Sequence, residues 1–447
     1  MTGFVPMSLE QRQKMLETVG LTREQLFAHI PDNLKLKQTE FEGLNKEGIS
    51  EMEIELKLMD LAAKNANSCE YDSYLGAGLY DHFSPYLPSY LIQRSEFLTA
   101  YTPYQPEISQ GTLRATFEWQ TYMCRLTGMD LVNASMYDGA SAAAEAALMA
   151  FREKRKAKKV WISAGLNPEY IDTIKTYLHA GGFEYEVGEL NADGTACGTY
   201  PEAEGYAAFF IQSPNFYGQL EDLDSFVEAA HAQKALATAV MDPLALTMLA
   251  TPGDKGVDIV VGEAQPLGVP VSFGGPALGY MGCTEKLMRK MPGRIVGRTE
   301  DKDGNDVYVL TLQAREQHIR RDRATSNICT SQQLIATLSN IHMALMGRDG
   351  LLEAAEQSAA KAIYLQKKLI ETGLFKAKYE GPFFREFALV PQGFDLNELN
   401  HKLLDKKIIG GLVLEENGEQ NWLLAVTEKK TKAKLDRFVE AVVELAK

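Results

Sequence analysis

Short apolar runs alternate with amphipathic stretches through the middle of the chain. The apolar runs are each short enough for a single strand and lie at 160–162, 183–190, 207–212, 235–241 and 257–261. The stretches at 139–156, 168–179 and 220–233 have helical character. Short apolar strands separated by helices are typical of a mostly parallel sheet that is covered on both faces. We therefore expect an α/β fold with a large domain of this kind.

The two ends of the chain have different patterns. Two short amphipathic stretches, 8–19 and 21–30, open the chain, and Ser50 to Glu53 fits the capping box of a further helix. That helix is imperfectly amphipathic, which suits either an arm buried between subunits or a core element. We expect residues 1–65 to form a helical arm.

The last hundred residues predict a second, smaller domain. A long helix at 350–371 is closed by Gly373. After it, strands are expected at 384–390, 411–414 and 421–426, with helices at 396–404 and 431–445. The expected division is thus a large domain at 66–345 and a small α/β domain at 346–447.

Composition narrows the function classes. Of the 447 residues, 45% are hydrophobic and 24% charged, and the net charge of -14 argues against nucleic acid or an anionic membrane as a partner. The five cysteines are odd in number and contain no CxxC spacing, so neither a disulfide framework nor a cysteine zinc site is expected, and no metal is predicted. Without a signal peptide or a run of about 20 apolar residues, we expect a cytoplasmic protein.

Four segments are dense in residues that packing does not require. Leu75 to His82 is glycine-rich and either approaches an anion through its backbone or forms a plain turn. Glu96 to Gly111 is irregular and rich in tyrosine, proline and glutamine, so it is either a rigid tie between subunits or part of a site wall.

The other two segments carry anion-binding chemistry or a structural role. Asn133 to Ser141 precedes the alanine-rich helix, where free amides bind phosphate and where Asp138 or Ser141 can equally cap the helix. Gln313 to Thr330 holds four arginines and a histidine within nine residues, fit for a carboxylate or phosphate, or for an ion-paired interface.

Read together, these segments resemble the glycine decarboxylase family, in the form split into two subunits. The resemblance spans about 75–439 and rests on the blocks LGAGLYDH, TAYTPYQPEISQGTL, SMYDGASA, GEAQPLGVPVSFGGP, REQHIRRDRATSNICT and LAVTEKKTKAKLDRFV. It implies the architecture of fold-type I pyridoxal phosphate (PLP) enzymes, with a mostly parallel large-domain sheet and a smaller C-terminal α/β domain.

Enzymes of that fold hold PLP through a phosphate cup at a helix start, an aspartate against the pyridine nitrogen and a lysine Schiff base. The resemblance places a degenerate cup at Tyr137, Asp138 and Ser141, and the aspartate at Asp242 after its strand. No lysine lies between Lys255 and Lys286, and Pro266 stands near the Schiff-base position. Because proline has no amine, we expect no covalently bound PLP and no catalysis by this chain alone.

The resemblance also implies partners. A beta-type subunit, expected in an α2β2 assembly, would carry PLP and decarboxylate glycine, and the aminomethyl group would pass to the lipoyl arm of H-protein, with T- and L-proteins in the same system. The expected interface and active-site wall residues of this chain are Tyr101, Thr102, Tyr104, Gln105, Glu107, His318, Arg320 and Arg321.

Two other functions stay open from the sequence. A non-catalytic scaffold or regulatory subunit would only raise the activity of a competent partner. A self-sufficient PLP enzyme using an unexpected lysine would show an internal-aldimine absorbance band as a single chain.

Overall fold

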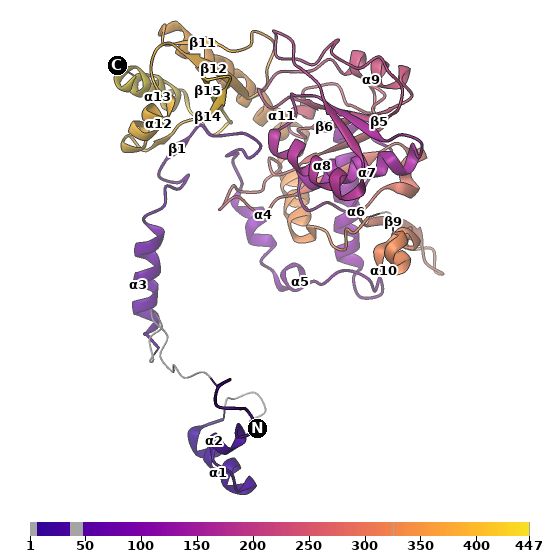
Figure 1. Cartoon of the computed structure of the whole chain (residues 1–447), viewed down its shortest axis with the longest axis vertical. Helices are drawn as coiled ribbons and strands as arrows, with labels where there is room; N and C mark the ends of the chain where they lie inside the picture. The colour runs from indigo at the N-terminus through magenta and orange to yellow at the C-terminus, as the bar shows by residue number, and fades with distance from the viewer. Residues whose placement is uncertain (1–6, 36–47, 325, 447) are drawn as a thin grey trace. The chain divides into compact units, whose positions relative to one another are not determined.

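A computed structural model describes residues 7–35, 48–324 and 326–446 of the chain (Figure 1). Contacts divide the chain into two units, Met1–Ala66 and Asn67–Lys447, each described here by itself. No helix described in the first unit, α1 (Leu9–Val19), α2 (Arg23–Leu26) or α3 (Glu51–Ala62), has a buried residue. The helix expected at 21–30 is reduced to the single turn of α2, whereas the choice between an arm and a core element for the helix at 51–62 stays a prediction.

A capping box starts each of these helices. The side chains of the cap residues Ser8, Thr22 and Ser50 accept a hydrogen bond from the third helical N–H. In turn the side chains at that third position, Gln11, Gln25 and Glu53, accept one from the backbone N–H of the cap residue. These reciprocal bonds satisfy donors that a helix start leaves free, so the three helices form locally without tertiary burial.

The second unit is built on a seven-stranded sheet in the order β2-β8-β7-β6-β5-β3-β4. Its strands are β2 (Leu131–Val132), β3 (Lys159–Ile162), β4 (Glu184–Val187), β5 (Tyr206–Ser213), β6 (Leu236–Met241), β7 (Ile259–Glu263) and β8 (Gly279–Cys283). Strands β3 to β7 pair in parallel, and β8 runs antiparallel to both β7 and β2. The mostly parallel sheet expected from the sequence is confirmed.

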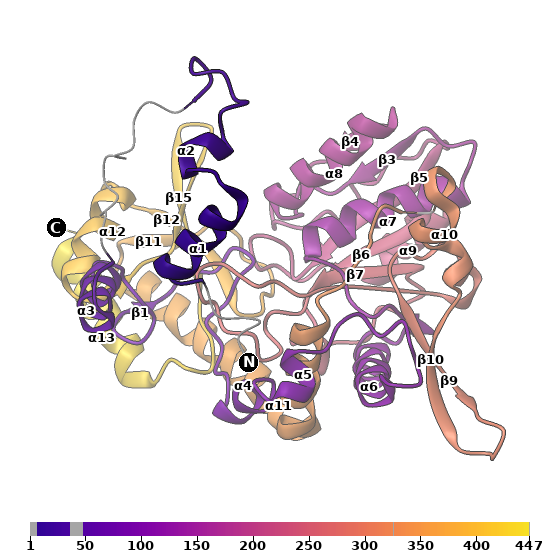
Figure 2. The ribbon, with the colours of Figure 1, turned by 90° about the horizontal axis from the view of Figure 1, so that it is seen from below.

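Helices cover both faces of this sheet. Alternate side chains of the strands pack against α7 (Gly139–Glu153) and α8 (Pro168–Gly181) on one face, and against α6 (Gln110–Thr127), α9 (Leu223–Ala232) and the start of α11 (Gln333–Glu371) on the other. Figure 2 shows α7 and α8 on one side of β6 and β7, with α6 on the opposite side. This double covering is the reason that the central strands β5, β6 and β7 are mostly apolar and buried, whereas β4 at the edge of the sheet is exposed.

Strand β8 was missed by the sequence analysis. It begins at Gly279 and contains a second glycine, Gly282, and glycine has low strand propensity. A Cβ at Gly279 would lie 2.2 Å from the Asp138 carbonyl oxygen, so the backbone here runs too close to its neighbour for any side chain. The requirement is tertiary and leaves no apolar pattern in the sequence.

Helix α11 begins earlier than the sequence indicated. It starts at Gln333, whereas only 350–371 was expected, and its path bends at Gly347, whose backbone is non-helical at φ 63° and ψ -174°. The first part packs against α6, and the second part lies in the small domain. Glycine is required at the bend because φ is positive there.

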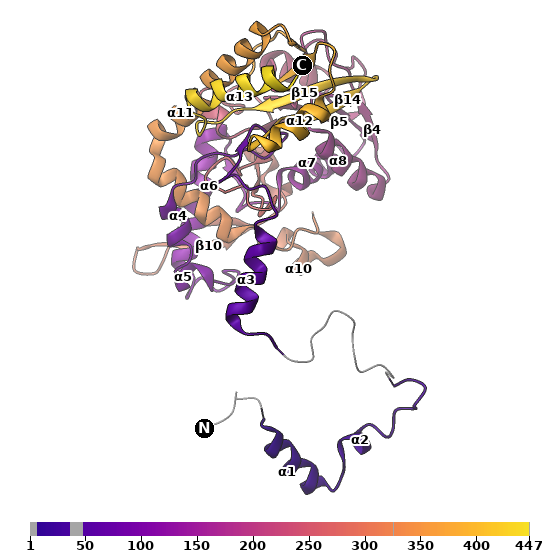
Figure 3. The ribbon, with the colours of Figure 1, turned by 90° about the vertical axis from the view of Figure 1, so that its left-hand side faces the viewer.

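The small domain is a four-stranded antiparallel sheet, β11 (Phe375–Ala377), β12 (Glu386–Pro391), β15 (Glu419–Ala425) and β14 (Leu412–Glu416). Side chains of α11, α12 (Leu396–Asp405) and α13 (Lys432–Leu445) share one core with it, and Figure 3 shows α13 running beside β15. The opposite face carries Ala388 and Leu423, which pack against Phe216 of the large domain. This contact brings the start of β12 to the large sheet.

The remaining elements of the second unit are short. They are β1 (Asp72–Ser73), paired in parallel with β13 (Ile408–Ile409), helices α4 (Tyr86–Leu91), α5 (Ser95–Leu98) and α10 (Gln317–Arg320), and the hairpin β9 (Ile295–Glu300) and β10 (Asp306–Thr311). Among the helices that the structure describes, none combines the length and apolar character needed to cross a bilayer.

Candidate functional site

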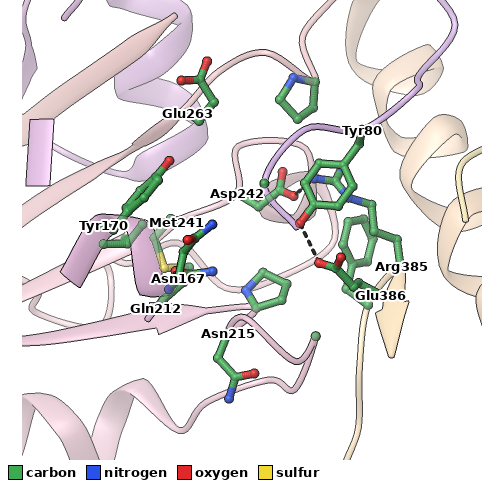
Figure 4. A pocket seen from close by; sticks show the side chains of 16 residues that line it. Tyr80, Asn167, Tyr170, Gln212, Asn215, Met241, Asp242, Glu263, Arg385 and Glu386 are labelled. Carbon is green, nitrogen blue, oxygen red and sulfur yellow. Dashed lines mark hydrogen bonds and ion pairs between the residues drawn. The ribbon is translucent and has the colours of Figure 1, made fainter. Parts of the chain in front are cut away.

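A pocket of about 60 Å³ opens beyond the carboxyl ends of β5, β6 and β7 (Figure 4). In open α/β sheets ligands bind at this edge. The small domain closes the pocket with Arg385 and Glu386 at the start of β12, and the glycine-rich 75–82 segment contributes Tyr80. The pocket therefore depends on the docking of β12 on the large domain.

The N-terminal end of α7 faces this pocket, and one of its backbone N–H groups already binds an acidic side chain of the same protein. Asp138 caps the helix by accepting from the Ser141 N–H at 2.7 Å. The free Gly139 N–H donates to Glu263 at 3.1 Å, and Glu263 also accepts from the backbone of Leu278 at 2.6 Å. Burial raises the pKa of Glu263 to about 7. A carboxylate thus sits where a helix start would otherwise bind an external anion.

Tyr170 closes the same helix start from α8. A Cβ built on Gly139 would lie 2.1 Å from the Tyr170 hydroxyl oxygen, so the phenol covers the first turn of α7. The Tyr170 side chain is half-buried, and desolvation raises the pKa of its hydroxyl well above the ordinary value. Together Glu263 and Tyr170 fill the space in which a phosphate would lie.

Asp242 follows β6 and is held by an ion pair. One oxygen accepts from the Leu244 N–H at 2.9 Å, and the other contacts the Arg385 guanidinium. Arg385 stacks on the Tyr80 ring, with 3.5 Å between the guanidinium carbon and the ring centroid. Asp242, the residue expected to contact a cofactor ring nitrogen, is therefore ion-paired with an arginine of this chain.

Tyr80 and Glu386 form the opposite wall. The Tyr80 hydroxyl donates to Glu386 at 2.7 Å, and the Ala77 N–H donates to the second Glu386 oxygen at 2.7 Å. Burial raises the pKa of Glu386 to about 7. These bonds tie the 75–82 segment to the small domain.

These residues do not fit PLP. Pro266, which the resemblance places near the Schiff-base position, lines the pocket and has no amine. The Gly139 N–H at the expected phosphate cup is bonded to Glu263, and Asp242, the aspartate expected to contact the ring nitrogen, is ion-paired with Arg385. A cavity of about 60 Å³ has room for about four to six water-sized groups. PLP has sixteen non-hydrogen atoms, more than the enclosed part of this pocket holds.

Only part of the predicted cofactor pocket lines this cavity. Asp242 and Pro266 do so, whereas Asp138 and Ser141 cap α7 just behind Glu263. Tyr137 points elsewhere, because its hydroxyl accepts from the backbone of Cys329 at 3.3 Å. The sequence analysis did not single out the side chains of Tyr80, Tyr170, Glu263, Arg385 and Glu386 as site residues. For Arg385 and Glu386, the only indication in the sequence was a charged pair at the start of an apolar strand.

The predicted wall residues lie outside this pocket. Tyr101 is 83% exposed, Tyr104 is 43% exposed, and Gln105 and Glu107 are also exposed, all on the irregular segment between α5 and α6. Thr102 is half-buried there.

One contact joins that segment to the arginine-rich segment. Tyr104 and His318 meet edge to face, with ring centroids 6.1 Å apart, in a shallow second pocket. Arg294 donates to the Tyr104 hydroxyl at 2.9 Å and to the Cys329 carbonyl, and its side chain is buried.

The arginines of the second segment are more separate. Arg320 is exposed and donates from Nε to the Ala314 carbonyl at 2.9 Å, and Arg321 is exposed with a φ of 55°. The structure thus brings together Tyr104 and His318 but not Arg320 and Arg321 with them.

The fold is that of fold-type I PLP-dependent enzymes. A glutamate decarboxylase of Lactobacillus brevis, 14% identical, shares it with a TM-score of 0.67 over 92% of this chain and 95% of that chain. A glycine decarboxylase (P-protein) of the glycine cleavage system, solved in inhibitor-bound form, matches with a TM-score of 0.88 at 40% identity, over 99% of this chain and 100% of that chain.

The sequence places the chain within one family. The family described as glycine cleavage system P-protein matches residues 2–442. A probable glycine dehydrogenase (decarboxylating) subunit 1 of Anoxybacillus flavithermus is 47% identical over 443 residues, which is 98% of each chain. A protein of the same description from Exiguobacterium sibiricum is 46% identical over 445 residues, again 98% of each. The chain belongs to the glycine cleavage system P-protein family, and its relatives are named as one subunit of a heteromeric enzyme.

Proposed function

We propose that this chain is the lysine-free, alpha-type subunit of a heteromeric glycine decarboxylase. A beta-type subunit carries PLP, and the pair decarboxylates glycine and passes the aminomethyl group to the lipoyl arm of H-protein, in a system that also contains T- and L-proteins. The observation that carries the proposal is the filled cofactor place: Glu263, Arg385 and Pro266 stand where PLP would be held. The chain alone is inactive for this reason.

The surface that meets the partner is the segment 83–108. It exposes a run of large apolar and aromatic side chains: Phe83, Tyr86, Leu87, Tyr90, Leu98, Tyr101, Tyr104 and Ile108. Exposed apolar surface of this extent is typical of a protein interface. Tyrosine suits such a surface because it buries a large ring and keeps a polar group for hydrogen bonding.

The role of this chain is to shape the partner's site from one side. Tyr101, Thr102, Tyr104, Gln105 and Glu107 supply hydroxyl, amide and carboxylate groups from irregular backbone that packed elements hold at both ends. His318 is held against Tyr104, and Arg320 and Arg321 are exposed positive charges that follow His318 along the chain. Groups of these kinds orient a substrate and exclude water.

The test is reconstitution. The purified chain is mixed with the lysine-bearing subunit, and exchange of labelled carbon dioxide into glycine is measured with each chain alone and with both. Exchange should need both chains. Tyr101→Ala and Glu107→Ala should lower it in the pair while the chains still co-purify, and Glu202→Ala, an exposed acid on the large domain, is the matched control.

Two outcomes would contradict the proposal. Exchange by the lysine-bearing subunit alone at the rate of the pair would make this chain a scaffold. Exchange by this chain alone would make it a self-sufficient enzyme.

A further inference from the structure

The cavity at the carboxyl edge of the sheet is too small for PLP but large enough for a small metabolite. Its volume of about 60 Å³ corresponds to about four to six water-sized groups. It lies between the ends of β5 and β6 on one side and the start of β12 on the other, and Figure 4 shows the labelled polar side chains arranged around it. The enclosed part of the pocket matches the dimensions of the smallest amino acids.

The charges around the cavity favour a ligand with a positive group. Three carboxyl groups, those of Asp242, Glu263 and Glu386, line it together with the single guanidinium of Arg385. Burial raises the pKa of both glutamates to about 7, which reflects the cost of holding several negative charges out of water. An ammonium group in the cavity would lower that cost by charge compensation.

The cavity also offers donors for a negative group. Arg385 is 2% exposed, and its Nε has no hydrogen-bond partner among the described residues. A buried guanidinium N–H without an acceptor is costly. Gln212 uses its carbonyl oxygen to accept from the Asn167 N–H at 2.9 Å, so its amide nitrogen is the group that it can offer to a ligand.

We propose that this pocket is a binding site for a small zwitterionic amino acid of about the size of glycine. The ammonium group is compensated by Asp242 and Glu386, and the carboxylate accepts from Arg385 Nε and the Gln212 amide. Glycine has five non-hydrogen atoms, which matches the room available. The chemical class rests on the cavity alone, whereas the choice of glycine as the probe rests on the proposed function.

Occupancy of this site would stabilise the docking of the small domain. Arg385 and Glu386 belong to the start of β12, whereas Asp242 and Gln212 belong to the large sheet. A ligand that contacts both groups binds only when the two are together, so it favours that arrangement by mass action.

The test uses the purified full chain without any second subunit. Calorimetric titration and thermal unfolding are measured with glycine, and separately with methylamine, acetate and L-leucine. Glycine should raise the unfolding midpoint and give a saturable heat of binding. Methylamine and acetate, which each carry one of the two charges, should bind at least about tenfold more weakly, and L-leucine should not bind because its side chain exceeds the cavity.

Gln212→Glu is the matched variant. It keeps the shape and the acceptor for the Asn167 N–H but replaces the amide donor by a negative oxygen. Glycine should then bind at least about tenfold more weakly. Gln392→Glu makes the same change at an exposed position beyond β12 and should leave binding unchanged.

Absence of glycine binding to the wild-type chain overturns the proposal, as does L-leucine binding as tightly as glycine or unchanged binding by Gln212→Glu. None of these results bears on the exchange assay of the reconstituted pair, so the two proposals fail separately.

Discussion

The Glu263 carboxylate accepts a hydrogen bond from the Gly139 N–H at 3.1 Å, at the first turn of α7. A helix start carries free N–H groups and partial positive charge, and it binds phosphate in many proteins. Here an acid at the end of β7 takes that place, so the chain supplies its own anion. The fold keeps the architecture of a PLP enzyme, but the chain's own side chains occupy the helix start and pair with Asp242.

Restoring the lysine alone should not restore cofactor binding. In Pro266→Lys, Glu263 and Arg385 still fill the phosphate and ring places. Incubation with PLP, borohydride reduction and peptide mapping should find no more label at position 266 than background labelling of surface lysines. Pro266→Ala controls for loss of the proline. Stoichiometric label at residue 266 in the single variant would show that the pocket does accept the cofactor.

The stability of the chain should depend on the protonation of Glu386. Its folded pKa of about 7 lies above the ordinary value of 4.5 for a glutamate because of burial. The folded state therefore keeps the proton after the unfolded state has released it, so this contribution is fully present below about pH 4.5 and is lost as the pH rises through about 7.

The measurement is a comparison of wild type with Glu386→Gln, which can keep both hydrogen bonds without titrating. From about pH 5 to about pH 8 the wild type should lose about 3 kcal/mol relative to the variant, seen as a fall in the relative unfolding midpoint. A difference that does not change with pH would mean that Glu386 is ionised throughout.

Gly218 should tolerate no side chain. A Cβ there would lie 1.7 Å from the Glu386 carbonyl oxygen, on the contact between the two domains, and its φ is +85°. Gly218→Ala should therefore cost about 4 kcal/mol or more of unfolding free energy. Gly198→Ala is the control, because Gly198 has a φ of +78° with open space around it, so it should cost only about 1–2 kcal/mol of backbone strain. Equal losses for the two variants would show that the domains can move apart here without cost.

Arg294 should act through Tyr104. It donates to the Tyr104 hydroxyl at 2.9 Å and to the Cys329 carbonyl, so it fixes the ring next to His318. In the reconstituted pair, Arg294→Lys and Tyr104→Phe should each lower exchange by about tenfold. The double variant should lose little more than either single one, because both remove the same contact. Arg298→Lys is the control, because Arg298 lies on strand β9 just after Arg294, is exposed and is paired with Asp306. If the losses of exchange activity in the two single variants added up fully in the double variant, Arg294 and Tyr104 would act independently.

The sequence by itself determined the elements whose burial is uniform along their length. The apolar runs of β5, β6 and β7 and the alanine-rich α7 are visible because strands covered on both faces and a helix packed closely on a sheet leave strong patterns. The absence of a lysine between Lys255 and Lys286 is likewise a fact of the chain, as is the charge-rich segment 313–330.

Only the tertiary structure decided what fills the pocket. Glu263 follows its own strand, but Arg385 lies more than a hundred residues further along the chain and reaches Asp242 because the small domain docks on the large sheet. The contact between Tyr104 and His318 likewise joins two segments that are far apart in the sequence. A charged residue at a strand end has the same local pattern whether it faces water, a cofactor or another charge, and its partner is set by which segments fold together.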